Sequence, residues 1–321
     1  MYFTESNNFY HGIMFHHFHN DNIHKKGQGS ISANDFYKII NFIGRKNILD
    51  ADVFFDKYKN NKLKENEVCI TFDDALKCQI DIALPVLEDL KIKSFFFVYT
   101  SIFEEKPDFL EVFRYFRNNY FKNVDDFYLE FYKSLDKDLN SFFKQNKKRI
   151  LNTKSKFPFY SIEDIKFRLV RDHLISKKHY DNIISAMMSE KNFIPEDFFS
   201  ILFFSENDVK NLNSLGHTIG LHSHNHPTLL EKLNYNEQKN EYEKCFLHLS
   251  KILSSKKNII KSMSHPCGSY NGNTLQILND LNIELGFKQI MSIDKSMKKI
   301  NNSNLEIARE DHSNILRRIK K

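Results

Sequence analysis

Two adjacent carboxylates, Asp73 and Asp74, stand at a position where chemistry is expected. They directly follow residues 68–72, whose β-branched, aromatic and small apolar side chains predict a strand buried on both faces. Neighbouring side chains at a strand end point in different directions, so one carboxylate can bind a metal while the other faces a water molecule. The alternative is that Asp74 caps a helix beginning near Ala75 and that Asp73 is a solvated turn residue. The two acids alone do not decide between these interpretations.

A second group of chemically competent side chains is the imidazole cluster His222, His224 and His226. Gly220 before it and Pro227 after it argue against a helix, so we expect a strand end or loop on which these side chains point the same way. Two neutral imidazoles and one carboxylate make an open divalent-metal site with positions left for water and substrate. Because all three imidazoles would share one direction, their spacing does not decide which two are ligands.

Strands and helices in alternation must position these groups. A strand, a helix and a strand follow one another within residues 68–99, which indicates a βαβ unit of a parallel sheet or barrel. Further strands are predicted at 12–15, 216–221 and 259–264. In an α/β barrel the carboxyl ends of the strands lie on one face, so the acids and the imidazoles are expected to meet there. His16 follows the first strand and is expected on the same face.

Residues 104–197 interrupt this alternation. Phe and Tyr recur there at helical spacing, and glycine is almost absent. We expect a helical insertion in a single domain 1–321, whose barrel comprises 1–103 and 198–321. The aromatic stripes predict core packing rather than a cofactor site. The insertion could serve as a lid or as a partner-docking surface.

Composition excludes several classes of protein. The net charge of +6 comes from scattered lysines without a Gly/aromatic RNA-binding pattern, so no nucleic-acid partner is expected. The four cysteines form no C-x-x-C pair, which argues against a zinc ribbon or a thioredoxin motif. The sequence has no apolar run of 18 residues, and its first residues have neither a basic nor an apolar signal region. We therefore expect no integral membrane segment and a cytoplasmic location.

Three segments resemble the motifs of the polysaccharide deacetylases, the NodB-homology group also called carbohydrate esterase family four. Residues 71–74 are similar to the first motif, 216–229 to the second and 264–271 to the third. The resemblance covers both flanks of the insertion, or about two-thirds of the chain. It implies an α/β fold, a distorted (β/α) barrel of the NodB-homology type carrying the large helical insertion. It also implies one divalent metal ion, usually zinc.

The resemblance further implies how the metal and the base are arranged. Asp74, His222 and His226 would hold the ion. Asp73 would be the general base that activates water against an acyl carbonyl. The metal would polarise that carbonyl and lower the pKa of water, so that hydroxide is available near neutral pH.

Two further groups follow from the same resemblance. The backbone N–H of Cys267 would donate to the developing oxyanion. Phe15-His16 is similar to the Tyr-His element near the N-terminus of rearranged members, so His16 would protonate the leaving amine. His312 is the runner-up for this acid, but no apolar strand precedes it.

The sequence departs from the family pattern at three positions. Ala75 replaces the glycine that usually follows the two acids. Ser264 stands in the place of the third motif's arginine, and His265 stands where proline or tyrosine is common. That arginine normally orients the base. Arg309, in an Ile-Ala-Arg segment like that of the rearranged members, is the expected substitute and completes the catalytic set.

These observations predict a metal-dependent hydrolase that removes an acetyl or formyl group from an amino sugar by cleaving a linear amide. The expected substrate is an acylated amino sugar linked to a nucleotide, a lipid or an oligosaccharide in surface-glycan biosynthesis. The expected location favours a nucleotide-linked or lipid-linked intermediate over a finished wall polymer. The alternatives are an O-deacetylase and a catalytically degenerate carbohydrate-binding barrel. A metal phosphoesterase is a third alternative, but a single Asp-His-His site offers few ligands for two-metal phosphate chemistry.

Overall fold

The computed structural model describes residues 12–20, 22–64, 66–105, 107–156, 160–254, 260–289 and 301–320. The chain forms two compact units. The first consists of Met1–Lys26, Ser30–Asp108 and Ser200–Lys321, and the second consists of Gly27–Gly29 and Phe109–Phe199. The predicted bounds of the insertion, 104–197, differ by a few residues from those of the second unit's long segment, Phe109–Phe199.

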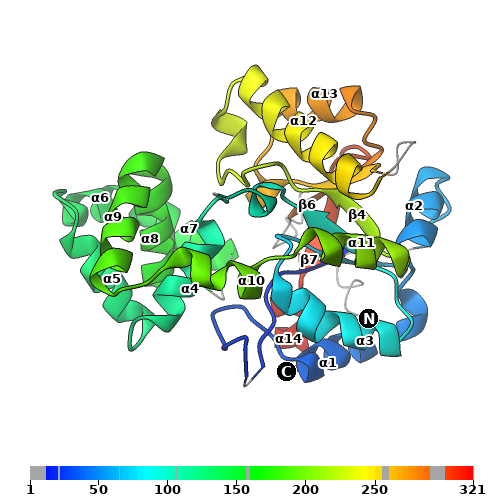
Figure 1. Ribbon diagram of the computed structural model, residues 1–321, viewed down its shortest axis with the longest axis horizontal. Coiled ribbons are helices and arrows are strands. Elements are labelled where there is room, and N and C mark those ends of the chain that lie inside the picture. The colour runs from blue at the N-terminus through cyan, green and yellow to red at the C-terminus, as the bar shows by residue number, and fades with distance from the viewer. Residues whose placement is uncertain are drawn as a thin grey trace. The chain divides into compact units, whose positions relative to one another are not determined.

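Among the described residues, seven parallel strands form a closed barrel in the first unit (Figure 1). The strands are β1 (Gly12–Phe15), β2 (Cys69–Phe72), β3 (Phe95–Val98), β4 (Thr218–Leu221), β5 (Ser262–Ser264), β6 (Leu285–Gln289) and β7 (Ile307–Asp311). Each strand pairs with the next one along the chain, and β7 pairs with β1 to close the barrel. The predicted (β/α) barrel is thereby confirmed. Ile259, the first residue of one predicted strand, lies outside the described residues.

Helices connect the strands of this unit. They are α1 (Ala33–Ile43), α2 (Ala51–Lys59), α3 (Leu84–Asp89), α11 (Glu206–Ser214), α12 (Tyr235–Ile252), α13 (Gly272–Asp280) and α14 (His312–Ile319), with the π-helix η2 (Gln79–Ala83) and the short 3₁₀ helices η1 (Arg45–Asn47), η3 (Ser101–Phe103), η5 (Leu230–Lys232) and η6 (Pro266–Gly268). The predicted cap of α1 is confirmed, because the side chain of Ser32 accepts a hydrogen bond from the backbone N–H of Asp35. In Figure 1, α1 lies beside α3 and α14, and α12 lies beside α13.

The barrel interior is apolar at one end and polar at the other. An apolar cluster joins Ala51 and Phe54 of α2 to residues of four strands, which are Cys69, Phe95, Phe97, Leu285, Phe287 and Ile307. Side chains two residues apart on a strand share one face, so β2 places Cys69, Thr71 and then Asp73 along the interior. The strands thus build their core near their amino ends and present polar side chains at their carboxyl ends.

The second unit is helical. It contains α4 (Leu110–Asn119), α5 (Val124–Lys133), α6 (Leu139–Gln145), α7 (Lys147–Lys156), α8 (Ile162–His173), α9 (Lys177–Glu190) and η4 (Pro195–Phe198), and α10 (Phe199–Leu202) begins at its last residue. Aromatic rings form its core: the Phe167 ring lies 5.3 Å from that of Phe127 and 5.0 Å from that of Phe131. The predicted packing role of the aromatic stripes is confirmed. None of the helices that the structure describes combines the length and apolar character needed to cross a bilayer.

Candidate active site

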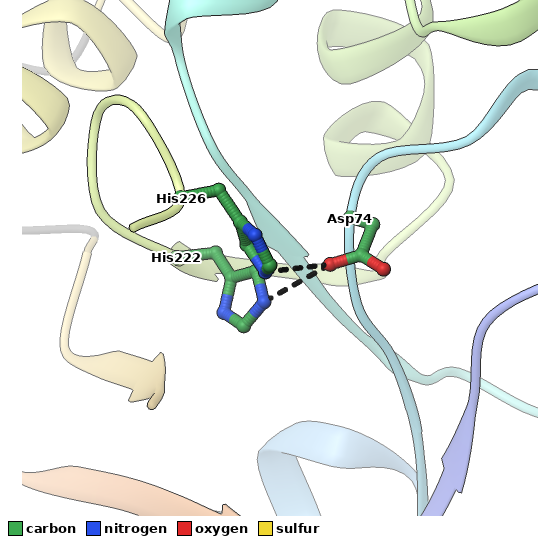
Figure 2. A group of neighbouring side chains, drawn as sticks. All are labelled: Asp74, His222 and His226. Carbon is green, nitrogen blue, oxygen red and sulfur yellow. Dashed lines mark hydrogen bonds and ion pairs between the residues drawn. The ribbon is translucent and has the colours of Figure 1, made fainter. Parts of the chain in front are cut away.

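Asp74, His222 and His226 come together at the carboxyl ends of β2 and β4. Their ligand atoms lie within 4.8 Å of one another, and all three residues are buried. The Nε2 atoms of His222 and His226 approach the same oxygen, Asp74 Oδ1, at 3.2 and 3.1 Å (Figure 2). Two imidazoles and a carboxylate therefore converge on one point.

The hydrogen bonds of His222 test whether a cation fits this point. Its Nδ1 lies 2.8 Å from the carbonyl oxygen of Ser264, which can only accept a hydrogen bond, so Nδ1 carries a proton. In the neutral imidazole Nε2 then has no proton and can only accept a hydrogen bond. It faces a carboxylate oxygen of Asp74, which is also an acceptor. Two acceptors this close repel each other unless a positive charge lies beside them. The donor set and the second hydrogen bond of the imidazole are those of a divalent-metal site.

The backbone at the end of β2 explains how Asp74 reaches the imidazoles. Asp74 and Ala75 both have left-handed backbone conformations, with φ of 74° and 50°. The chain turns sharply here and helical residues begin only at Lys77, so the alternative in which Asp74 caps a helix at Ala75 is wrong. Asp73 is also not a solvated turn residue, since it is 2% exposed. Burial alone would raise the pKa of Asp74, but positive charge at the imidazoles of His226 and His222, when they are protonated, outweighs burial and holds that pKa well below its ordinary value.

The loop after β4 separates His224 from its two neighbours. Ser223 and His226 have positive φ angles of 63° and 52°, so the loop is not extended. The imidazole of His224 turns to Thr100, whose Oγ1 lies 2.9 Å from Nδ1. The expectation that all three imidazoles point the same way is wrong, and the turn itself selects His222 and His226 as the converging pair.

Glu241 holds this loop and was missed by the sequence analysis. Its carboxylate accepts hydrogen bonds from the backbone N–H groups of His224 (3.0 Å) and Asn225 (2.7 Å) and from the amide of Asn225 (2.7 Å). Glu241 is 7% exposed and lies on the buried face of α12 with Gln238 and Cys245. Helical spacing places Glu241 on this buried face. An acid at a core position of a helix needs a polar partner, so this position could have been identified from the sequence.

Asp73 is held by a guanidinium from the opposite end of the chain. Arg309 on β7 donates from NH1 to Asp73 Oδ1 at 2.7 Å and from NH2 to Oδ2 at 2.6 Å. Ser264 donates to Asp73 Oδ2 at 3.1 Å and accepts from Arg309 NH2 at 2.7 Å. Burial would raise the pKa of Asp73, but Arg309 and, to a lesser degree, His222 hold it below its ordinary value. Asp73 is therefore ionised at neutral pH.

Arg309 can reach Asp73 because β1 offers no side chain in its path. A Cβ atom on Gly12 would lie 2.7 Å from Cγ of Arg309, closer than such atoms approach. Arg309 itself is 1% exposed, and its guanidinium also donates to Oγ1 of Thr71 at 3.1 Å. The residue proposed from the sequence as a substitute for the third motif's arginine thus contacts the carboxylate that it was expected to orient.

His16 lies beside both carboxylates, whereas His312 lies elsewhere. His16 Nε2 is 3.8 Å from Asp73 Oδ2 and 4.0 Å from Asp74 Oδ2, and its side chain is 26% exposed. His312 packs against β1: its ring stacks on Phe15 with centroids 5.4 Å apart, and its Nδ1 lies 3.2 Å from the carbonyl oxygen of Met14. The geometry favours His16 over His312 as the acid.

Cys267 lies in η6, directly after β5. It has a left-handed backbone conformation with φ of 52°, and its side chain is exposed. The contribution of its backbone N–H to an oxyanion stays a prediction.

Comparison with known proteins identifies the class. The model of the polysaccharide deacetylase family matches residues 60–116 and 176–286, which is more than half of the chain. The chain therefore belongs to the polysaccharide deacetylase family. The matched residues include Asp73, Asp74 and both converging imidazoles, while His16 and Arg309 lie outside them.

Solved structures of deacetylases have the same fold. The deacetylase PplD of Streptococcus pyogenes, in complex with acetate, is 16% identical with a TM-score of 0.54 over 95% of this chain and 96% of its own. A de-N-acetylase from Aggregatibacter actinomycetemcomitans is 12% identical with a TM-score of 0.54 over 94% and 95% of the two chains. IcaB from Ammonifex degensii is 12% identical with a TM-score of 0.52 over 93% and 89%. At these identities the likeness shows the fold. No curated protein matches the chain.

Proposed function

We propose that this protein is a metal-dependent hydrolase that removes an acetyl or formyl group from the nitrogen of an amino sugar in surface-glycan biosynthesis. One observation carries the proposal: the converging group Asp74, His222 and His226 lies beside a carboxylate, Asp73, that an arginine keeps ionised. Membership in the polysaccharide deacetylase family supports a carbohydrate as the substrate.

Asp73 is the proposed general base. Asp74, His222 and His226 would hold a divalent ion, expected to be zinc, which when bound would supply Lewis-acid polarisation of the acyl carbonyl and lower the pKa of water. Asp73 accepts a proton from the attacking water. The paired hydrogen bonds from Arg309 fix the plane of the Asp73 carboxylate, so that its remaining lone pairs face the site in one orientation.

His16 is the proposed general acid. It lies within 4.0 Å of both carboxylates and is partly exposed, so a substrate can reach it. When the C–N bond breaks, its electron pair goes to nitrogen, which takes the proton from His16 and leaves as an amine. The acyl group leaves as a carboxylate. The backbone N–H of Cys267 donates to the oxyanion that precedes this step.

The proposed substrate is an acylated amino sugar linked to a nucleotide, a lipid or an oligosaccharide. The donor set and family membership support a sugar amide without selecting one of these carriers. The cytoplasmic location stays a sequence-based prediction, which cell fractionation tests.

The decisive experiment measures carboxylate released from N-acetylated glucosamine oligomers, acylated nucleotide sugars and lipid-linked glycans, with and without a chelator. Asp73→Asn should lower turnover about 10²- to 10⁴-fold, because the variant loses the base. It should keep stoichiometric metal, because Asp73 is not among the three converging ligands. His222→Ala is the matched control and should lose both metal and turnover. Undiminished turnover in Asp73→Asn, or a wild-type protein that releases phosphate and no carboxylate, would contradict the proposal.

A further inference from the structure

Gln79 is a buried amide that contacts the backbone of both proposed acid–base residues. It is the first residue of η2 and is 0% exposed. Its Nε2 donates to the carbonyl oxygen of Asp73 at 2.6 Å and to that of His16 at 2.9 Å. One side chain therefore ties the proposed base to the proposed acid.

These two carbonyls lie just past the end of a strand pair. The last residues paired between β1 and β2 are Phe15 and Phe72, and the backbone N–H of Asp73 then donates to the carbonyl of Phe15 at 3.1 Å. His16 and Asp73 each follow the last paired residue of their strand. The amide of Gln79 links the two segments at this point, in the place where a longer ladder would have linked them.

An amide suits both contacts without placing a charge in this buried position. The NH₂ group has two N–H donors and can serve two carbonyl acceptors at once, whereas the flipped amide would set Oε1 against two carbonyl oxygens. The left-handed residues Asp74 and Ala75 turn the chain so that Gln79 folds back to Asp73, six positions earlier. A π-helix begins at Gln79, and π-helical turns are frequent at functional sites.

We propose that Gln79 is a positioning residue that sets the separation between His16 and Asp73. The catalytic meaning of this role rests on the proposed function. Among the described residues, the hydrogen bonds of the Gln79 amide go to two backbone carbonyls, so it acts through the two residues that it joins. Without its two hydrogen bonds, His16 loses the link to Asp73 that extends beyond the last paired residue, Phe15, and the 3.8 Å approach of the imidazole to the proposed base is no longer held by the amide.

A leaving-group comparison tests this role. Gln79→Met keeps the length of the side chain and removes both N–H donors. An N-acetylated glucosamine pentamer needs a proton on its departing nitrogen, whereas p-nitrophenyl acetate releases a stable anion that needs none. We expect kcat for the pentamer to fall about 10- to 100-fold with KM unchanged, because small misplacements of a catalytic group are costly. The rate with the ester should stay within about twofold. Equal losses on both probes, or no loss on either, would overturn the proposal.

Gln238→Met is the matched control. Gln238 is also a buried glutamine of the barrel unit, and its Nε2 donates to the carbonyl oxygen of Leu233 at 2.8 Å. Its loss should lower stability while leaving the ratio of amide to ester turnover unchanged. Gln79→Asn provides a second variant if Gln79→Met does not fold. It keeps the amide on a shorter stem that reaches one carbonyl, so its ratio should lie between those of the wild type and the methionine variant.

A crystallographic comparison separates failure of this inference from failure of the proposed function. Crystal structures of the wild type and Gln79→Met give the distance between the carbonyl oxygens of His16 and Asp73 without any assay. We expect this distance to increase in the variant. If the wild type hydrolyses neither probe, the proposed function fails and the measured distance still decides the role of Gln79. An unchanged distance overturns the inference.

Discussion

At the scale of single residues, the site depends on charges that burial would otherwise suppress. A carboxylate as buried as Asp73 would ordinarily take up a proton, because a low-dielectric surrounding disfavours the charged form. Arg309 reverses this preference by pairing both of its outer nitrogens with the two carboxylate oxygens. Ser264 bridges the pair, so the position that lacks the family's usual arginine still contacts the base. Asp73, the proposed base, therefore remains ionised at neutral pH within a closed barrel.

Ala75 stores backbone strain next to this base. Its φ of 50° lies in the left-handed region, which costs an alanine about 1–2 kcal/mol. Losing its buried methyl group would cost about 0.8 kcal/mol, which is less than the strain relieved. Because glycine also loses about 0.4–1 kcal/mol more chain entropy on folding, we expect Ala75→Gly to raise the free energy of unfolding by no more than about 0.8 kcal/mol in urea titrations. Ala186→Gly, in the exposed middle of α9, should instead lower it by about 0.5–1 kcal/mol. Equal losses in the two variants would show that Ala75 is unstrained.

At the scale of elements, α12 determines the shape of the loop that carries two proposed ligands. Glu241→Ala removes three hydrogen bonds from the segment between His222 and His226. We expect zinc affinity, measured by competition with a chromogenic chelator, to fall about 10- to 100-fold, as when an outer-shell partner is lost. Glu241→Gln, which keeps an acceptor, should restore part of it.

Glu237→Ala is the control on the same helix. Glu237 belongs to the capping box of α12, where its carboxylate accepts from the backbone N–H of Asn234 at 2.8 Å. This variant should weaken the helix without changing zinc affinity. A similar loss of affinity in Glu237→Ala and Glu241→Ala would mean that helix stability, and not the loop contacts, governs binding.

Glu310 on β7 is a buried carboxylate whose pKa shifts in the direction opposite to that of Asp73. Burial raises the pKa of Glu310 from 4.5 to about 7, although Asn314 and Arg318 partly oppose the shift. The folded protein therefore binds this proton more tightly than the unfolded chain. The contribution to stability is fully present below about pH 4.5 and is lost as the pH rises to about 7.

Glu310→Gln should remove this pH dependence. Gln keeps the acceptor for the 2.6 Å hydrogen bond from Asn314 and never ionises. We expect the variant to match the wild type near pH 4.5 and to be more stable by about 3 kcal/mol at pH 8, as judged by urea midpoints. A difference between the two proteins that does not vary with pH would contradict this assignment.

At the scale of the whole molecule, two units with separate cores should respond differently to the metal. The three converging residues all belong to the barrel unit, just after β2 and β4, and a ligand that binds only the folded state stabilises that state. Zinc at 100 times its dissociation constant should add about 2.7 kcal/mol to the barrel. Hydrogen exchange with and without chelator should therefore show a loss of protection in β2 and β4 and none in α5 and α8. An equal loss of protection in both units would contradict a metal site confined to the barrel unit.

Local patterns in the sequence were sufficient for much of the fold. The doubly buried strands, the capped helix α1 and the aromatic core of the helical unit each follow from composition and period within a few residues. The acids at 73–74 and the imidazole cluster were also visible, because reactive side chains directly after an apolar strand form a local signal. Strand ends in a barrel share one face, which is why the two groups could be expected to meet.

The tertiary structure decided which side chains complete the site. The left-handed turn at Ser223 and His226 separates His224 from the converging pair, and periodicity contains no sign of such a turn. Gln79 and Glu241 bind backbone groups of other segments, and the sequence does not show which segments these are, although an acid at a core position of α12 was a signal for Glu241. Arg309 meets Asp73 across 236 positions only because β7 pairs with β1 and closes the barrel. Sequence patterns report on neighbours along the chain, whereas a contact of this range depends on the closure of the entire sheet.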